Sequence, residues 1–212
     1  MKLKFYDGLS EHKRLLLGTV LLFGCIVLID VFMRSYRVNG IIKSCSLAFG
    51  PLDEVQKDSI RLIVRAFDKY GDKDLNKLAY ILATARYESN FRPIEERRAA
   101  PSQTEVYNRQ NRYWGTGYWG RGFVQLTHQK NYRKMSDFLG VDLVKNPSLA
   151  LDPNNAAKIL VYGMLNGLFT RQRLSQYING SIVDFYQARK TVNGLDRAGR
   201  VAGYANSVND KL

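Results

Sequence analysis

Two glutamates, Glu88 and Glu96, stand eight positions apart with Pro93 between them. Glu88 ends an apolar helical stretch, where the helix dipole and burial both favour the protonated form of a carboxyl. Such a carboxyl suits a general acid, and a second carboxylate across a cleft could act as a general base. Glycosidic hydrolysis needs this pair, because one carboxyl protonates the leaving oxygen while the other activates water. Glutamates at this spacing are usually solvated, so the pair alone does not define an active site.

A glycine- and aromatic-rich segment, YWGRGFVQLTHQKNY, spans residues 118–132. Trp119 beside the glycine-rich turn could stack on a sugar ring, and Gln125, Thr127 and Asn131 could hydrogen-bond to it. The alternative interpretation is an ordinary junction between a loop and a helix, with Thr127 as the N-cap. The turn is too short for a phosphate-cradling loop and lacks the strand–helix context of one, so we expect no nucleotide site.

Taken together, these segments resemble glycoside hydrolase family 19, the chitinase-like group that includes many bacteriophage endolysins. The family pattern has a glutamate in an H-E-[ST] context, a second glutamate, and then Y-x-G-R-G-x-x-Q-L-[ST]-x-x-x-N-Y. The chain has Y-E-S at residues 87–89, P-I-E-E at residues 93–96, W-G-R-G-F-V-Q-L-T from residue 119, and N-Y at residues 131–132. LGVDLVKNPSLALDPNNAAKIL (139–160) and TVNG (191–194) also resemble the family. The similarity covers roughly residues 78–204.

The resemblance implies an inverting mechanism with Glu88 as the general acid and Glu96 as the general base. Further implied site residues are Thr127, which would help to hold the water, Gln125, Asn131 and Asn193, which would contact substrate, and Arg197, as a charge partner of the carboxylates. Three features depart from the family pattern: Tyr87 replaces the usual histidine, the glutamates are closer in sequence than in plant chitinases, and a single glycine follows Asn193. Glu95 adjoins Glu96, so either could be the base, and the third place after the proline favours Glu96.

Three functions fit these residues. The leading hypothesis is a membrane-anchored peptidoglycan hydrolase that cleaves β-1,4 bonds, acting in phage or virus lysis or entry, although a chitin-like glycan is not excluded. The second is a lytic transglycosylase that uses Glu88 alone, because ESNFRP (88–93) resembles the E-S-x-F-x-P run of that group. The third is a non-catalytic, anchored protein that only binds the wall.

Residues 52–212 have mostly helical patterning, so we expect a mostly α domain with little or no sheet. The resemblance implies that this domain has a lysozyme-like fold of the family 19 chitinase type. Apolar periodicity predicts helices near residues 55–67, 74–88, 127–139, 152–165 and 196–209, and Ser181 with Asp184 resembles a capping box that opens another. Residues 89–122 show no clear period and are expected to form a long loop with a short hairpin.

The N-terminal part has a different character. We expect a basic tail (1–13), a transmembrane helix (14–33), a linker (34–51) that ends in a Gly-Pro breaker, and a catalytic domain (52–212). Nineteen helical residues rise about 28 Å, close to the roughly 30 Å hydrocarbon core of a bilayer. Four basic residues precede the apolar run and three follow it, which favours a cytoplasmic N-terminus. The catalytic domain would then lie in the periplasm, or the helix would anchor it in a virion membrane.

Composition limits the possible cofactors and binding partners of the chain. Two cysteines rule out a disulfide-stapled scaffold, and with two histidines they leave little for a zinc site, so we expect no metal or cofactor. The 32 Lys and Arg residues against 19 Asp and Glu give a net charge of +13, which implies an anionic partner such as a wall polymer or lipid headgroups. The basic residues are scattered, so we expect no nucleic-acid partner. The sequence does not determine the oligomeric state.

Overall fold

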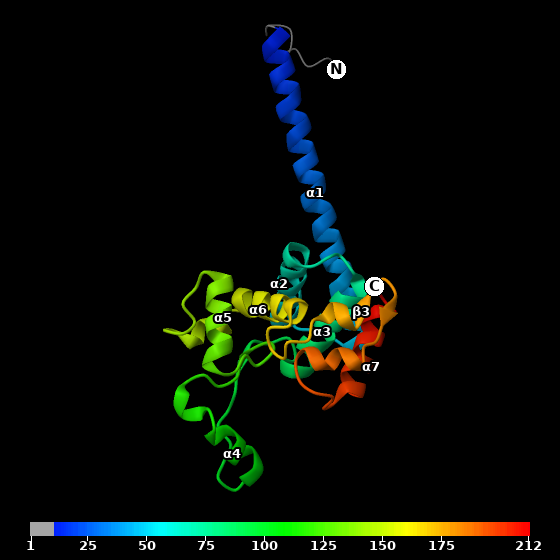
Figure 1. Ribbon diagram of the computed structural model, residues 1–212. Helices are drawn as coiled ribbons and strands as arrows, with labels where there is room; N and C mark the ends of the chain where they lie inside the picture. The colour runs from blue at the N-terminus through cyan, green and yellow to red at the C-terminus, as the bar shows by residue number, and fades with distance from the viewer. Residues whose placement is uncertain (1–10) are drawn as a thin grey trace. The chain divides into compact units, whose positions relative to one another are not determined.

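The computed structural model describes residues 11–212, which divide into two compact units between Ile41 and Ile42. The first unit consists of most of helix α1 (Glu11–Phe49) (Figure 1). The segment Thr19–Phe49 is long and apolar enough to cross a membrane, a criterion that a membrane anchor and an N-terminal signal sequence both meet. Asp30, the acidic residue within the apolar run, forms a salt bridge of 2.9 Å with Arg34, one helical turn later.

The predicted linker over residues 34–51 is helical for most of its length. Helix α1 runs without a break to Phe49, and its last turns belong to the second unit, where Ile42, Ser44 and Cys45 are buried. Residues 34–49 contain no proline, and helical geometry persists until Gly50, which adopts a positive φ of 86° before Pro51. The Phe49 ring then packs edge-on against Tyr204, with 5.3 Å between the ring centroids.

Two helix pairs form the core of the second unit. Helix α2 (Glu54–Tyr70) packs against α6 (Pro153–Asn166), and α3 (Leu75–Ser89) packs against α7 (Ala198–Asn209). Every residue of α3 from Lys77 to Ala85 is buried, which makes it the central helix of this unit. The expected mostly helical domain is confirmed, and the last helix ends at the predicted residue.

Local signals in the sequence define the ends of these helices. The side chains of Asp74 and Asp152 accept hydrogen bonds from backbone N–H groups in the first turns of α3 and α6. Helix α2 begins with a capping box between Asp53 and Gln56 that the sequence analysis did not identify. Gly71 follows the end of α2, and a Cβ there would lie 2.6 Å from the Phe67 carbonyl oxygen.

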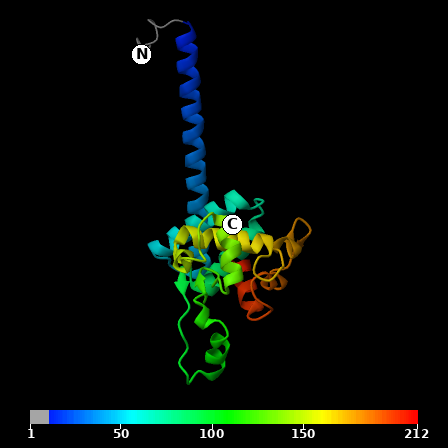
Figure 2. The ribbon, with the colours of Figure 1, turned by 60° about the vertical axis from the view of Figure 1, so that its left-hand side comes forward.

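The region expected to be a long loop contains a helix. Its two ends pair as short antiparallel strands, β1 (Ile94–Glu95) and β2 (Arg121–Gly122). Residues 96–120 separate these strands, so they do not form the short hairpin that was expected. Between them, α4 (Thr104–Asn111) and the 3₁₀ turn η1 (Trp114–Thr116) were not predicted. We call residues 96–120 the arm, and Figures 1 and 2 both show it extending away from the core helices.

Two expectations about helix starts were wrong. Helix α5 (Gln129–Leu139) begins two residues after Thr127, whose hydroxyl instead donates a 2.8 Å hydrogen bond to the Gln125 carbonyl. The η2 turn (Pro147–Leu151) then leads into α6.

The second wrong expectation concerns Ser181 and Asp184, which do not open a helix. Residues 178–183 form a hairpin of β3 (Ile178–Asn179) and β4 (Ile182–Val183). The Asn179 side chain accepts hydrogen bonds from the N–H groups of Ser181 and Ile182 and so closes the turn. Short 3₁₀ turns flank the hairpin, η3 (Leu174–Gln176) before it and η4 (Gln187–Thr191) after it. The pair Gly180-Ser181 forms the two-residue turn between the paired residues Asn179 and Ile182. A Gly-Ser pair between two short strands is a hairpin signal, and it outweighs the Ser–Asp spacing.

Candidate active site

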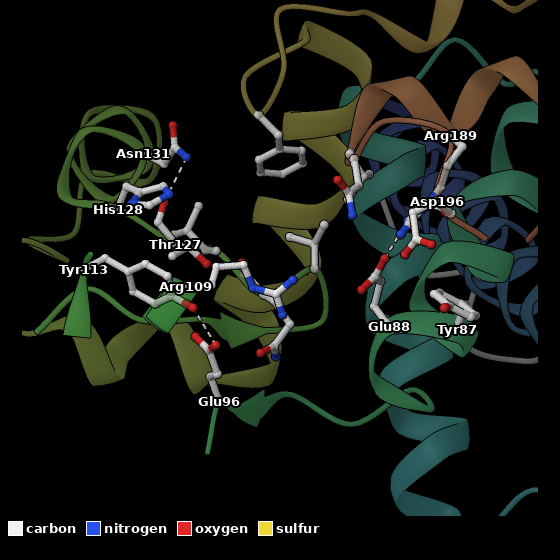
Figure 3. Close-up of a pocket in the computed structure, with 16 residues that line it drawn as sticks. Tyr87, Glu88, Glu96, Arg109, Tyr113, Thr127, His128, Asn131, Arg189 and Asp196 are labelled. Atoms are coloured by element: carbon white, nitrogen blue, oxygen red, sulfur yellow. Dashed lines mark hydrogen bonds and ion pairs between the residues drawn. The ribbon is translucent and has the colours of Figure 1, made fainter. Parts of the chain in front are cut away.

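A cleft of about 610 Å³ in the second unit gathers most of the predicted site residues. Its lining includes six of them: Glu88, Glu96, Gln125, Thr127, Asn131 and Asn193. Figure 3 shows two facing groups of side chains, with Glu96 and Thr127 on one side and Glu88 on the other. The arm and the start of α5 build the first wall, whereas α3 and the segment after the β3–β4 hairpin build the second.

Glu88 lies in the last turn of α3 and pairs with a buried arginine. The Arg189 Nη1 donates a hydrogen bond of 2.5 Å to Glu88 Oε1, and the exposed fractions of the two side chains are 2% and 17%. Both charges are therefore largely removed from water. Their attraction is much stronger in this environment than it would be at the protein surface. Arg189 sits in η4 and so ties the helix that carries Glu88 to the region after the hairpin.

Arg189 lines the cleft but was not among the predicted site residues, because it belongs to none of the segments that carry the resemblance. Its Nε donates a 3.0 Å hydrogen bond to the Asp196 carbonyl, and its guanidinium lies 5.4 Å from the centre of the Tyr87 ring. The expected charge partner, Arg197, is placed elsewhere. It is exposed, does not line the cleft, and has Asp196 as its acidic neighbour at 3.8 Å.

Glu96 follows β1, and its carboxylate accepts three hydrogen bonds. The Tyr113 hydroxyl and the Gln110 amide donate to Oε1 at 2.6 and 3.0 Å, and the Gly120 N–H donates to Oε2 at 2.9 Å. The Glu96 N–H in turn donates to the Gly120 carbonyl at 2.7 Å, so the two ends of the arm are joined at this carboxylate. Gln110 is buried and also binds the backbone of Arg97 and Ala99, which fixes its orientation.

This network controls the ionisation of Glu96. Burial alone would raise its pKa, but the hydrogen bonds from Tyr113, Gly120 and Gln110, together with the charge of Arg109, outweigh that effect and hold the pKa below its usual value. Burial and the neighbouring carboxylate raise the pKa of Tyr113 to about 12, so the phenol remains a donor at neutral pH. Glu96 is thus an anion that is fixed in orientation and faces the cleft.

The neighbouring Glu95 is used differently. Its Oε1 accepts hydrogen bonds of 2.8 Å from both the Trp119 indole N–H and the Arg121 Nε, and it does not line the cleft. Trp119 also lies outside the cleft lining. It stacks on Trp114 with 4.8 Å between ring centroids, and the Arg121 guanidinium lies 4.4 Å from the Trp119 ring. The predicted sugar-stacking residue therefore packs within the base of the arm.

The polar side chains of the GRGFVQLT segment stabilise its backbone, which is left-handed at Gln125. Gln125 has a positive φ of 54°, and its amide donates to the carbonyls of Ile94 and Gly122 at 3.1 and 3.2 Å. A Cβ at Gly120 would lie 2.6 Å from Gln125 Oε1, so a side chain there would displace the Gln125 amide. The Asn131 amide donates to the Thr127 carbonyl at 2.9 Å, which orients both residues toward the cleft wall.

Six further cleft residues were not predicted as site residues. They are Arg109 and Tyr113 of the arm, His128, Phe169, Val192 and Asp196. His128 packs edge-on against the Tyr113 ring, with 5.3 Å between centroids. Within residues 11–212, the structure contains no group of three or more His, Cys, Asp or Glu residues that could hold a metal ion.

Comparison with known proteins assigns the family. The family model for class I chitinases, glycoside hydrolase family 19, matches residues 81–209, which include both walls of the cleft. The chain belongs to glycoside hydrolase family 19, a family of glycosidases. A curated relative, Chitinase 11 of Oryza sativa subsp. japonica, is 36% identical over 94 residues, which are 43% of this chain and 34% of that protein. The chain thus aligns with about a third of the length of that relative.

Solved structures confirm the fold. Chitinase C from Streptomyces griseus HUT6037 superposes with a TM-score of 0.54 at 18% identity, covering 80% of this chain and 73% of that one. A bacterial family 19 chitinase superposes with a TM-score of 0.50 at 18% identity, covering 78% and 91%. The predicted family 19 chitinase-type helical fold is therefore correct.

Proposed function

We propose that this family 19 member hydrolyses β-1,4 glycosidic bonds between N-acetylated sugars, with Glu88 as general acid and Glu96 as general base. One observation carries the proposal: the two carboxylates line one cleft from different walls, and each is held by its own partners. Glu96 is kept anionic by three hydrogen-bond donors, as a base requires, whereas Glu88 has one donor, on a single oxygen.

The proposed reaction needs one water and two proton transfers. Glu88 gives its proton to the leaving glycosidic oxygen while Glu96 removes a proton from the attacking water, whose oxygen bonds to the anomeric carbon on the opposite face and inverts it. The positive charge of Arg189 stabilises the anion that Glu88 becomes. Thr127 lines the same cleft as Glu96 and is proposed to help hold the water. Gln125, Asn131 and Asn193 are proposed to contact the sugars.

For the substrate, we propose peptidoglycan. The net charge of +13 attracts anionic wall polymers, although the matched relatives carry the name chitinase, so a chitin-like glycan is the comparison substrate. We further propose that residues 14–33 anchor the chain in a membrane, with the second unit, residues 42–212, as the catalytic domain on the periplasmic side or at a virion membrane. This unit begins earlier than the predicted boundary at residue 52. The apolar length of α1 and the Asp30–Arg34 salt bridge, which offsets the acidic charge in this helix, support an anchor. A role in phage or virus lysis or entry would follow from this location.

The test of activity uses the full chain in detergent: wild type, Glu88→Gln and Glu96→Gln, each on purified peptidoglycan and on chitin oligosaccharides. Products are read by mass spectrometry. Hydrated reducing ends that disappear with either substitution would support the two-carboxylate hydrolase. Anhydro ends, with Glu96→Gln still active, would establish a lytic transglycosylase instead. Binding without cleavage of either glycan would make the protein a wall-binding component.

The test of anchoring is separate. The full chain is expressed with a C-terminal tag and the cell membranes are washed with carbonate. Full-length protein retained in the washed membranes, with its tag accessible from the periplasm, would support the proposed topology. A shortened, soluble product would show that the apolar segment is a signal sequence.

A further inference from the structure

Arg109 differs from the other arginines near the two carboxylates. It is exposed, it lines the cleft from α4, and in the view of Figure 3 its side chain lies between Glu96 and Glu88. Within the described part of the chain its guanidinium makes no hydrogen bond or salt bridge, whereas Arg189 binds Glu88 and Arg121 binds Glu95. Its donors are therefore free to bind a ligand in the cleft.

The arm as a whole has an excess of positive charge. Between residues 97 and 120 it carries four arginines and one glutamate, and three of the arginines, Arg97, Arg109 and Arg112, are exposed. Of these three, Arg109 lines the cleft, and the other two do not. A guanidinium presents a planar set of donors that matches a carboxylate, and such charge-assisted bonds are stronger than those to a neutral hydroxyl or amide.

We propose that Arg109 is a specificity residue that binds a carboxylate carried by the glycan, so that the cleft prefers an acid-bearing polymer to a neutral one. The proposal rests on the proposed hydrolase function. In peptidoglycan the carboxylate would belong to a peptide stem attached to a sugar in the cleft. A neutral chitin chain offers no such group.

A simpler role for Arg109 has to be separated from this one. Its charge also favours the anionic form of Glu96, so its removal weakens the base whatever the substrate. That effect changes the rates on charged and neutral glycans by the same factor. A carboxylate contact changes their ratio, and the ratio is therefore the readout that separates the two roles.

The experiment compares two forms of one substrate: soluble peptidoglycan fragments with free peptide carboxylates, and the same fragments after conversion of the carboxylates to amides. The full chain in detergent is measured as wild type, Arg109→Gln, Arg109→Lys and Arg112→Gln. Arg112→Gln is the matched control, because this arginine is exposed, follows α4 directly and lies outside the cleft lining. We expect Arg109→Gln to lower kcat/KM roughly tenfold more on the charged form than on the amidated form. Arg109→Lys should restore part of this preference, and Arg112→Gln should keep all of it.

Equal losses on both forms with Arg109→Gln would overturn the proposal and assign Arg109 to the support of Glu96 alone. A wild type without preference would also overturn it. Binding of the two fragment forms is measured in parallel by calorimetry, in a Glu88→Gln background with and without Arg109→Gln. If the wild type cleaved neither form, the proposed hydrolysis would fail, yet a binding preference lost with Arg109→Gln would still support the carboxylate contact. Equal binding of the two forms would refute that contact.

Discussion

The guanidinium of Arg189 reaches the carboxylate of Glu88 across 101 positions of sequence, with 2.5 Å between Nη1 and Oε1. The side chain of Arg189 is 2% exposed and that of Glu88 is 17% exposed, so neither charge has full access to water. The same guanidinium binds the Asp196 carbonyl, which places the chain after η4 at the cleft. One buried arginine therefore aligns the proposed acid with one wall of the site.

Replacement of Arg189 tests this pair. Arg189→Met should destabilise the fold by about 3 kcal/mol, because it leaves a largely buried carboxylate without its partner. The free energy of unfolding of the full chain is measured by denaturant titration followed by circular dichroism. In a Glu88→Gln background the same substitution should cost less, since the unpaired charge is gone. Equal costs in the two backgrounds would show that Arg189 stabilises the fold by packing alone.

Glu96 gives a prediction about pH. The proposed base must be ionised, so activity should fall as the pH drops through its pKa, which lies below the usual range. Tyr113→Phe removes the 2.6 Å donor, which raises the pKa of Glu96 and should move the acidic limb of the kcat/KM profile to higher pH. Tyr118→Phe serves as the control, because this hydroxyl binds the Val144 carbonyl and not Glu96. An acidic limb that does not move would exclude Glu96 as the group that titrates.

The lowered pKa of Glu96 also predicts that the stability of the fold depends on pH. Because the pKa of Glu96 is lower in the folded than in the unfolded chain, its network stabilises the fold above the unfolded value of about 4.3, and this contribution disappears as the pH falls through the lower, folded value. The loss of unfolding free energy on acidification should therefore be smaller for Tyr113→Phe than for wild type. Parallel losses in the two proteins would show that this bond does not contribute.

Glu95 and Glu96 are separable by substitution. Glu95→Gln weakens the contacts to Trp119 and Arg121 outside the cleft and should lower activity less than tenfold. Glu96→Gln removes the proposed base and should lower kcat by about 10²–10⁴-fold. Both variants are assayed on the same glycan under the same conditions. A larger loss with Glu95→Gln would reverse the assignment of the base.

Gly163 in α6 gives a packing prediction. A Cβ at this position would lie 2.1 Å from the ring of Phe169, which lines the cleft. Gly163→Ala should therefore displace that ring, cost about 1–3 kcal/mol of stability and reduce substrate affinity. Gly203→Ala is the matched control, because Gly203 is an exposed position within α7 with no atom near the added methyl, and it should be neutral or stabilising by up to about 1 kcal/mol. Similar effects of both variants would contradict the assigned role of the Phe169 contact.

The helices that carry the core could be predicted from the sequence, because helix signals are local. The two carboxylates were selected by the resemblance to the family, since their spacing alone does not define an active site. Helix caps such as Asp74 and Asp152 act within a few residues, and the GRGFVQLT motif fixes its own turn. Arg189 could not be predicted, since its pairing with Glu88 depends on the packing of segments far apart in the chain. Arg197, which was expected in that role, lies close in sequence but is exposed.

The arm also could not be predicted in full from the sequence. Helix α4 could not be predicted from apolar periodicity, because it has few apolar residues and Gln110 is its one buried side chain. The partners of Glu96 within the arm, Gln110 and Tyr113, became identifiable once their hydrogen bonds were known. Trp119 is the opposite case: it was predicted to stack on a sugar, but its ring packs against Trp114 and Arg121.

The last turns of α1 limit how the second unit could be detached from the apolar segment. Ile42, Ser44 and Cys45 are buried within that unit, and the Ser44 hydroxyl donates a 2.6 Å hydrogen bond to the Lys211 carbonyl near the other end of the chain. A protease that cut after these residues would remove part of the core along with the apolar segment. A soluble fragment that keeps the whole unit therefore has to begin no later than Ile42, whether a cell or an experimenter makes the cut.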